Sequence, residues 1–238
     1  MTIQASGKVF RALNEEIKAS PAAELTVTEI TGQRYIGAGL SGKTLTLQGV
    51  PGNALGAYMN GAKIFVGGNA QDAVGDTMND GEIVVAGSCG DALGYAMRGG
   101  RILIKGNVGY RCGIHMKEYQ DKVPVIVMGG RAGSFLGEYQ AGGRIVVLNL
   151  AGETPVGDFC ATGMHGGRIY VRGGLGSAVL PSQVEARRAE SADLELIRGD
   201  IEAFCSAFGG DAGAILQEEF TLLSPNSKNP YKQLYTVY

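Results

Sequence analysis

Residues 71–104 read QDAVGDTMNDGEIVVAGSCGDALGYAMRGGRILI and contain one pattern twice, 19 residues apart. Each copy has a pentapeptide that ends in glycine (residues 71–75 and 90–94), followed three residues later by a methionine. An apolar triplet then follows, at residues 83–85 and 102–104. A repeat of this length, with short β segments between glycine turns, is too short for a propeller blade and predicts a β-solenoid.

The apolar triplet recurs along most of the chain. Seven copies begin at residues 45, 64, 83, 102, 125, 145 and 169, so the spacings are 19, 19, 19, 23, 20 and 24. Alternate residues of a strand point to opposite sides. The first residues of the triplets therefore predict one inner ladder, made of Leu45, Ile64, Ile83, Ile102, Val125, Ile145 and Ile169. The expected fold has an all-β core, a right-handed parallel β-helix of about seven coils, with short helices at its ends.

The glycines support this interpretation. The chain has 39 glycines among 238 residues, well above the usual share of about 7%. The glycine that ends each pentapeptide is expected at a sharp corner with positive φ, where a Cβ is unfavourable. These corner glycines are Gly56, Gly75, Gly94, Gly113 and Gly137.

The middle residue of each triplet is expected to point outward, yet most of these residues are apolar. A solvated face would carry polar residues instead. The outward apolar set predicts a face that is covered, either by the chain's own terminal segments or by another protein, and self-association through it stays open. The set is Phe65, Val84, Leu103, Ile126, Val146 and Tyr170.

The repeat predicts three segments. Residues 1–36 form an N-terminal cap with a helix near 9–17, and residues 37–174 form the β-helix. Residues 175–238 pack on it through helices at 182–208 and 211–219. Caps are expected because the end coils of a solenoid would otherwise expose core and unpaired strand edges.

Charge and composition limit the classes of partner. The net charge is -2, so no basic face for nucleic acid or anionic membrane is predicted. No apolar run reaches the roughly 18 residues that span a bilayer, and the first residues do not read as an export signal. The four cysteines are scattered, as in a cytoplasmic protein with reduced thiols.

No residue set predicts catalysis, cofactor binding or a metal site in this chain. Residues 37–42 match a dinucleotide-binding glycine pattern, but they lead into a strand where that site requires a helix. The pairs Cys112/His115 and Cys160/His165 have zinc-like spacing but fall on different coils, whereas structural zinc needs four converging ligands.

A carbohydrate-active β-helix enzyme remains an alternative. It would use acidic and basic side chains in an outer groove, and Asp72, Asp76, Asp91 and Arg98 are the candidates. Because Asp72 and Asp91 take the place of Asn53 in their repeats, a turn-forming role is the simpler interpretation.

Motifs at both ends of the chain resemble a known family. Residues 32–42, 68–75 and 81–85 are similar to the GXGXG domain at the C-terminal end of the glutamate synthase large subunit. The order of motifs after residue 207 matches as well: Phe208-Gly209-Gly210, residues 214–216, Phe220, Pro225 and Pro230-Tyr231. The resemblance implies a right-handed β-helix that packs against other domains and contributes no catalytic residue.

The resemblance also implies partners. The glutaminase and synthase domains of glutamate synthase are absent here, so the chain resembles the stand-alone version from a split complex. Its expected partners are a glutaminase-type amidotransferase and a synthase subunit carrying FMN and iron–sulfur clusters. The same module occurs in the β-helix subunit of formylmethanofuran dehydrogenase and in the third subunit of N-methylglutamate synthase. The identity of the complex stays open, and the C-terminal motifs favour glutamate synthase.

Overall fold

The computed structural model describes residues 1–226, so the Pro230-Tyr231 motif lies outside the described residues. Within that range the chain forms three helices and eleven strands, and all of these strands belong to one sheet. Its elements in chain order are β1 (Thr2–Gln4), α1 (Phe10–Ala19), β2 (Glu24–Thr31), β3 (Thr44–Val50), β4 (Asn60–Val66), β5 (Asp80–Val85), β6 (Arg101–Ile104), β7 (Val125–Met128), β8 (Ala141–Val147), β9 (Gly166–Arg172), β10 (Val184–Arg188), α2 (Ser191–Phe208), α3 (Ala212–Gln217) and β11 (Phe220–Pro225). The predicted mostly-β core with short terminal helices is confirmed.

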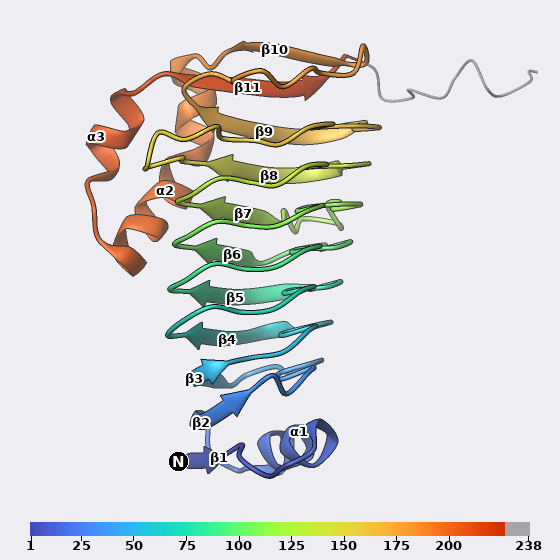
Figure 1. The fold of residues 1–238 in the computed structure, drawn as a ribbon, viewed down its shortest axis with the longest axis vertical. Helices are drawn as coiled ribbons and strands as arrows, with labels where there is room; N and C mark the ends of the chain where they lie inside the picture. Colours follow the sequence, from blue (N-terminus) through green and yellow to red (C-terminus); the bar gives the residue numbers. More distant parts are fainter. Residues whose placement is uncertain (227–238) are drawn as a thin grey trace, which may run out of the picture.

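The strands stack in chain order. Strands β1 to β9 pair in parallel, each with the next, and β11 and then β10 add antiparallel strands at the far end. Figure 1 shows the strands as rungs along the long axis, with α1 at one end and α2 and α3 beside the other half. A second, narrower parallel ladder of single bridges joins Ala70, Cys89, Val108, Ala132 and Val156. Successive repeats are therefore held together at two places around their circumference.

The register corrects the prediction at one repeat. Ile126 pairs with Ile102 on one side and Ile145 on the other, so the spacings there are 24 and 19. The prediction that Val125 points inward and Ile126 outward was wrong: Ile126 belongs to the inner core, and Val125 and Val127 face outward. A shift of one residue turns every side chain of a strand to the other face. All four residues of β7 are buried and apolar. The strand therefore has no alternation of polar and apolar residues from which to tell which side chains face inward.

The inner core consists of ladders of equivalent residues. The isoleucine ladder lies beside a methionine ladder, and a third ladder holds the residue before each corner glycine. Gln140 occupies the methionine position in its repeat and is completely buried. Its Nε2 donates to the carbonyl oxygens of Gly142 and Gly143, which satisfies the amide donor inside the core.

Each repeat turns at a corner where left-handed residues alternate with right-handed ones. In one corner Ala92, Gly94 and Ala96 have φ of 55°, 68° and 49°. The Ala92 N–H donates to Tyr110 in the next repeat, while the Gly94 N–H donates to Val74 in the previous repeat. All five predicted corner glycines have φ between 65° and 71°. These corners thus join each repeat to both of its neighbours.

The corner glycines also leave room for the isoleucine ladder. A Cβ on Gly94 would lie 2.5 Å from Cδ1 of Ile126 in the next repeat. The same close approach to the following isoleucine recurs at the other four. In the last such corner the equivalent residue is Ala161, and no further parallel repeat follows it. Positive φ therefore favours glycine at these five corners, and the close approach of the next isoleucine leaves no room for a Cβ there.

The C-terminal segment differs from the prediction. The expected helix over 182–208 begins only at Ser191, because residues 184–188 form β10 at the edge of the sheet. Helix α2 continues through Gly199, and its N-cap is Glu190. Residues 220–225, for which no element was predicted, form β11 between β9 and β10.

An ion pair fixes the start of α2. Asp193 accepts a hydrogen bond from Glu190 N–H at 2.9 Å and one from Arg187 at 2.6 Å. The hydrogen bond from Arg187, with the backbone one, lowers the pKa of Asp193 below its usual value. A depressed pKa in the folded state means that this carboxylate stabilises the fold at neutral pH and stops doing so as pH falls through its folded pKa.

We expect Asp193→Ala to lower the free energy of unfolding by about 1 kcal/mol at pH 7, because the capping box is lost. The difference from the unchanged protein should shrink towards pH 3, because the aspartate of the unfolded chain, with its usual pKa of about 3.9, binds protons before that of the folded protein does. Urea unfolding at both pH values measures it. Glu195→Ala, which removes an exposed pair with Arg198, is the control and should change stability by under about 0.5 kcal/mol. A loss at pH 3 as large as at pH 7 would contradict the electrostatic account.

Candidate partner-binding surfaces

The outward face of the sheet is covered by the chain's own helices over part of its length. Val84, Leu103, Val127, Val146 and Tyr170 follow one another in register across β5 to β9. They pack in one buried cluster with residues of α2 and α3, namely Ile197, Ile201, Phe204 and Leu216. This helix-side face therefore holds a second apolar core, outside the stack.

The six residues predicted for the outward face separate into three groups. Val84, Leu103, Val146 and Tyr170 lie under the helices. Ile126 lies inside the stack, as described above. Phe65 is on the helix-side face but remains 37% exposed.

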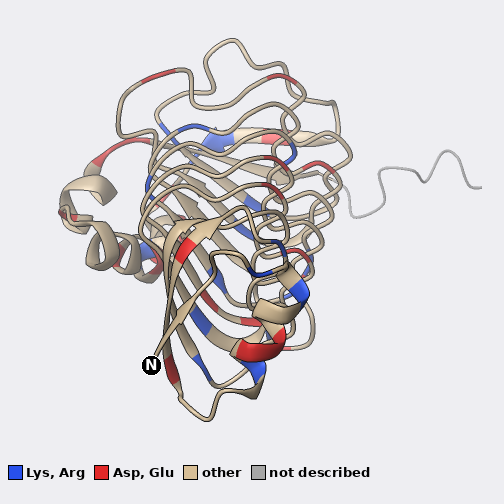
Figure 2. Cartoon of the chain, turned by 60° about the horizontal axis from the view of Figure 1, so that its bottom comes forward, with Lys and Arg blue, Asp and Glu red and all other residues tan. Residues whose placement is uncertain are grey.

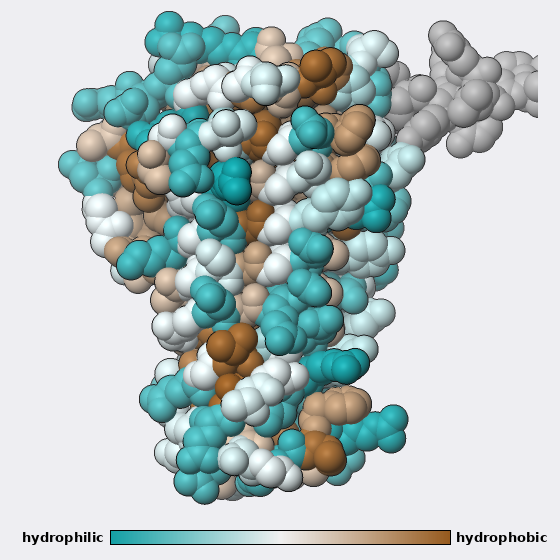
Figure 3. All heavy atoms as spheres, in the orientation of Figure 1, coloured by the Kyte–Doolittle hydropathy of each residue, from teal (hydrophilic) through white to brown (hydrophobic). Residues whose placement is uncertain are grey.

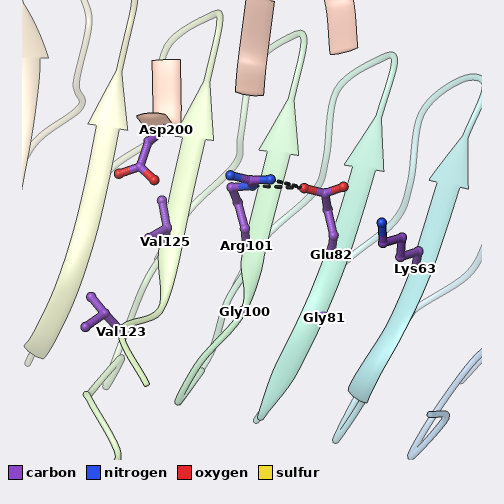
Figure 4. Close-up of a pocket in the computed structure, with 8 residues that line it drawn as sticks. All are labelled: Lys63, Gly81, Glu82, Gly100, Arg101, Val123, Val125 and Asp200. Atoms are coloured by element: carbon purple, nitrogen blue, oxygen red, sulfur yellow. Dashed lines mark hydrogen bonds and ion pairs between the residues drawn. The ribbon is translucent and has the colours of Figure 1, made fainter. Parts of the chain in front are cut away.

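A column of charged residues runs beside this apolar column. Lys63, Glu82 and Arg101 occupy equivalent positions on β4, β5 and β6, and Arg144 occupies the same column on β8. Arg101 forms an ion pair with Glu82, and Arg144 Nε lies 2.9 Å from the Asp200 carboxylate of α2. Figure 4 shows Arg101 and Glu82 pointing toward each other, with Lys63 and Asp200 on either side. Lys63, Glu82, Arg101 and Asp200 border a pocket of about 380 Å³.

Acidic and basic residues are mixed on the side of the molecule that Figure 2 shows. Figure 2 shows both signs interspersed along the stack, with no extended face of one sign in that view. Figure 3 shows a narrow column of apolar atoms along the stack between polar atoms, with smaller apolar patches beside the helices and near both ends. Figure 2 displays, in its view, no broad basic surface of the kind that nucleic-acid binding requires.

Aromatic residues stack on the surface at the corners, and the sequence prediction missed them. Phe135 lies 5.1 Å from Tyr110 and 4.8 Å from Phe159, measured between ring centroids. A second column stacks His115 on Tyr139 at 5.2 Å. The signal was present, because Phe135 and Phe159 occupy the same corner position as Ala92. Offset aromatic pairs of this kind add about 1 kcal/mol each between repeats.

Two of the three candidate acidic residues hold repeats together. Asp72 accepts a hydrogen bond from the Asp91 N–H at 2.9 Å, and Asp91 accepts one from the Tyr110 N–H at 2.8 Å. Each carboxylate therefore bridges to the next repeat and does not serve a turn within its own repeat. Asp76 accepts the Thr77 hydroxyl hydrogen bond at 2.8 Å. The three carboxylates thus have structural partners.

The described part of the chain contains no group of three or more metal-ligating side chains. Cys112 and Cys160 are completely buried in the inner core, and His115 is exposed at a corner. Residues 37–42 lead into β3, as predicted, and not into a helix. Within residues 1–226, no helix is both long and apolar enough to cross a membrane.

We expect one of the four cysteines to react with a thiol reagent in the folded protein at pH 8. Burial raises the pKa of Cys89 and of Cys160 to about 12 and also raises that of Cys112. Burial, with the nearby Asp211 carboxylate, raises the pKa of Cys205 as well, but this residue is only half-buried. Thiolates are the reactive species, so Cys205 should react and the other three only after unfolding in denaturant. Cys205→Ser should remove the native reaction; continued reaction in that variant would contradict the burial.

Comparisons with known proteins agree over almost the whole chain. The family model described as "GXGXG motif" matches residues 15–227. The uncharacterized protein MJ1350 of Methanocaldococcus jannaschii is 42% identical over 252 aligned residues, which cover 99% of this chain and 96% of that protein.

A solved structure shares the fold. It is a chain of the formyltransferase/hydrolase complex (FhcABCD) from Methylorubrum extorquens, solved in complex with methylofuran. The TM-score is 0.66 at 19% identity, over 92% of this chain and 89% of that one.

Proposed function

The chain belongs to the GXGXG motif family, and on that premise we propose that it is a non-catalytic structural subunit of a multi-subunit enzyme. The observation that carries the proposal is the likeness in fold, over 92% of this chain, to a component of such a complex. The described residues support it, since the acidic candidates are engaged in structural hydrogen bonds.

We further propose that the stacked repeats form a right-handed parallel β-helix of about seven coils. Neighbouring strands are parallel, and a bridge ladder follows the returning segments. Connections between parallel strands of one sheet are right-handed in almost all proteins, which supports the handedness. Each coil is bonded to the next at the sheet, the bridge ladder and the corner. Such a rod suits a scaffold that holds partners at a fixed distance.

Two complexes are candidates for the assembly. The solved structure supports a formylmethanofuran dehydrogenase-like complex, because the similar chain belongs to a formyltransferase/hydrolase complex. The C-terminal motifs support a glutamate synthase-type complex, in which an amidotransferase and a synthase with FMN and iron–sulfur clusters would be the partners, in the cytoplasm. At 19% identity the structural likeness is one of fold, so the partners themselves must decide between the two.

The experiment is affinity purification of the tagged chain from its native cells, followed by mass spectrometry and an absorbance spectrum of what it brings with it. Formyltransferase and hydrolase subunits would support the first complex. A glutaminase-like subunit with flavin and iron–sulfur absorbance would support the second. A colourless protein recovered alone, with binding to a polysaccharide, would contradict both and favour the carbohydrate-active alternative.

A further inference from the structure

The helix-side face continues beyond the part that α2 and α3 cover. In the apolar column, Val84 is followed downward by Phe65 on β4 and Thr46 on β3. Val84 is 7% exposed, Phe65 is 37% exposed and Thr46 is exposed as well. The face therefore changes from buried to open within one strand, without a change in its register.

The contact between α2 and the sheet shows what kind of element fits this face. Asp200 pairs with Arg144 in the charged column, while Ile201 and Phe204 pack in the cluster that contains Val146 in the apolar column. The contact thus combines one carboxylate with apolar side chains one and four residues later on the same helix.

The open part of the face repeats these two columns. Lys63 has the place of Arg144, and Phe65 has the place of Val146. Among the ion pairs of residues 1–226, none involves Lys63. The open part therefore offers a cation and an aromatic side chain at the same relative positions as the part that α2 occupies.

The pocket described above joins the two parts. It extends from Asp200, past Arg101 and Glu82, to Lys63. The surface beside the α2 contact is thus continuous with the open face, and an element lying there would extend the helical layer along the stack.

We propose that Thr46, Lys63 and Phe65 form the docking face for an amphipathic helix of a partner subunit, with a carboxylate of that helix placed against Lys63. The inference rests on the proposed function and names the surface through which the subunit is held. Aromatic side chains at the centre of an interface commonly carry much of its binding energy, so Phe65 is the expected anchor and Lys63 the residue that selects an acidic partner.

The test uses the complex purified from native cells through the tagged chain. Thr46→Arg adds a bulky charge on the open face without removing a buried group, and Phe65→Ser removes the anchor. Each should reduce the recovered partner by at least about tenfold, with little change in the melting temperature of the isolated chain. Leu196→Ser is the matched control, because Leu196 is an exposed apolar residue of α2, outside this face; it should leave recovery unchanged.

A photo-crosslinking amino acid at position 65 identifies the occupant. The expected product joins this chain to a helix of a partner subunit that carries an aspartate or glutamate, and Lys63→Glu should be rescued by reversing that charge in the partner. A crosslink to a second copy of this chain, or to its own C-terminal residues, would overturn the inference. Full partner recovery by the Thr46 and Phe65 variants would also overturn the inference but leave the proposed function intact. Failure of the chain without substitutions to recover any partner would contradict both the inference and the proposed function.

Discussion

Gly94→Ala should lower the free energy of unfolding by about 2–4 kcal/mol, with about 1 kcal/mol from the left-handed backbone and about 1–3 kcal/mol from overpacking. Its φ is 68°, and the added Cβ would lie 2.5 Å from Ile126 Cδ1 in the completely buried inner core. Urea unfolding of the purified chain measures the loss. Gly152→Ala is the matched control, because Gly152 has φ of 71° and a Cβ placed there would have no neighbour within 4 Å; it should cost only about 1 kcal/mol.

A second change separates packing from backbone strain. Ile126→Val removes the Cδ1 atom that the new Cβ would meet. Combined with Gly94→Ala, it should recover part of the loss, with a coupling of about 1 kcal/mol between the two sites. Equal losses for Gly94→Ala and Gly152→Ala, together with no coupling, would show that the isoleucine ladder does not require glycine at the corners.

Phe204→Ala should lower the free energy of unfolding by about 3–5 kcal/mol, the usual cost of removing a buried aromatic side chain. Phe204 is 1% exposed, packs edge-to-face against Phe208 with ring centroids 4.9 Å apart, and lies over Gly129 at the end of β7. Thermal or urea unfolding followed by circular dichroism measures the loss. We expect the signal of α2 and α3 to be lost before that of the stack, because the outer cluster is separate from the inner core.

Leu196→Ala provides the comparison on the same helix. Leu196 is 47% exposed, so the substitution should change stability by under about 0.5 kcal/mol. Both changes introduce alanine in α2, so differences in helix propensity favour the variants and do not explain a loss. A loss below about 1 kcal/mol for Phe204→Ala would mean that packing in the apolar cluster between α2 and the sheet does not stabilise α2.

The repeat made much of the fold predictable. The interval of 19 residues located β3 to β6, and the corner glycines followed from the requirement for positive φ. The phase of β7 was not predictable, because four consecutive buried residues carry no alternation. The insertion before it, where Tyr119 bridges Lys122, shifted the apparent spacing.

The candidate surface was predictable only in part. An apolar outward column could be recognised in the sequence, and the chain's own terminal segments were one of its two predicted covers. How far along the column the cover reaches could not be predicted, since it depends on where α2 lies. Residues 184–188 became an edge strand because β11 pairs with them, and such a pairing across 33 to 41 positions leaves no local signal. The aromatic columns were missed because single aromatic residues in separate repeats meet only when the repeats stack.

Because parallel strands stack one per repeat, the length of this molecule is set by its number of repeats. Each repeat adds one strand spacing of about 4.8 Å and brings its own corner and isoleucine. Loss or duplication of a whole repeat would therefore shift whatever is attached beyond it by that step and leave the cross-section unchanged. An assembly built on such a rod can adjust the separation of its parts only in discrete increments, whereas insertions such as residues 117–124 change the surface and leave the separation as it was.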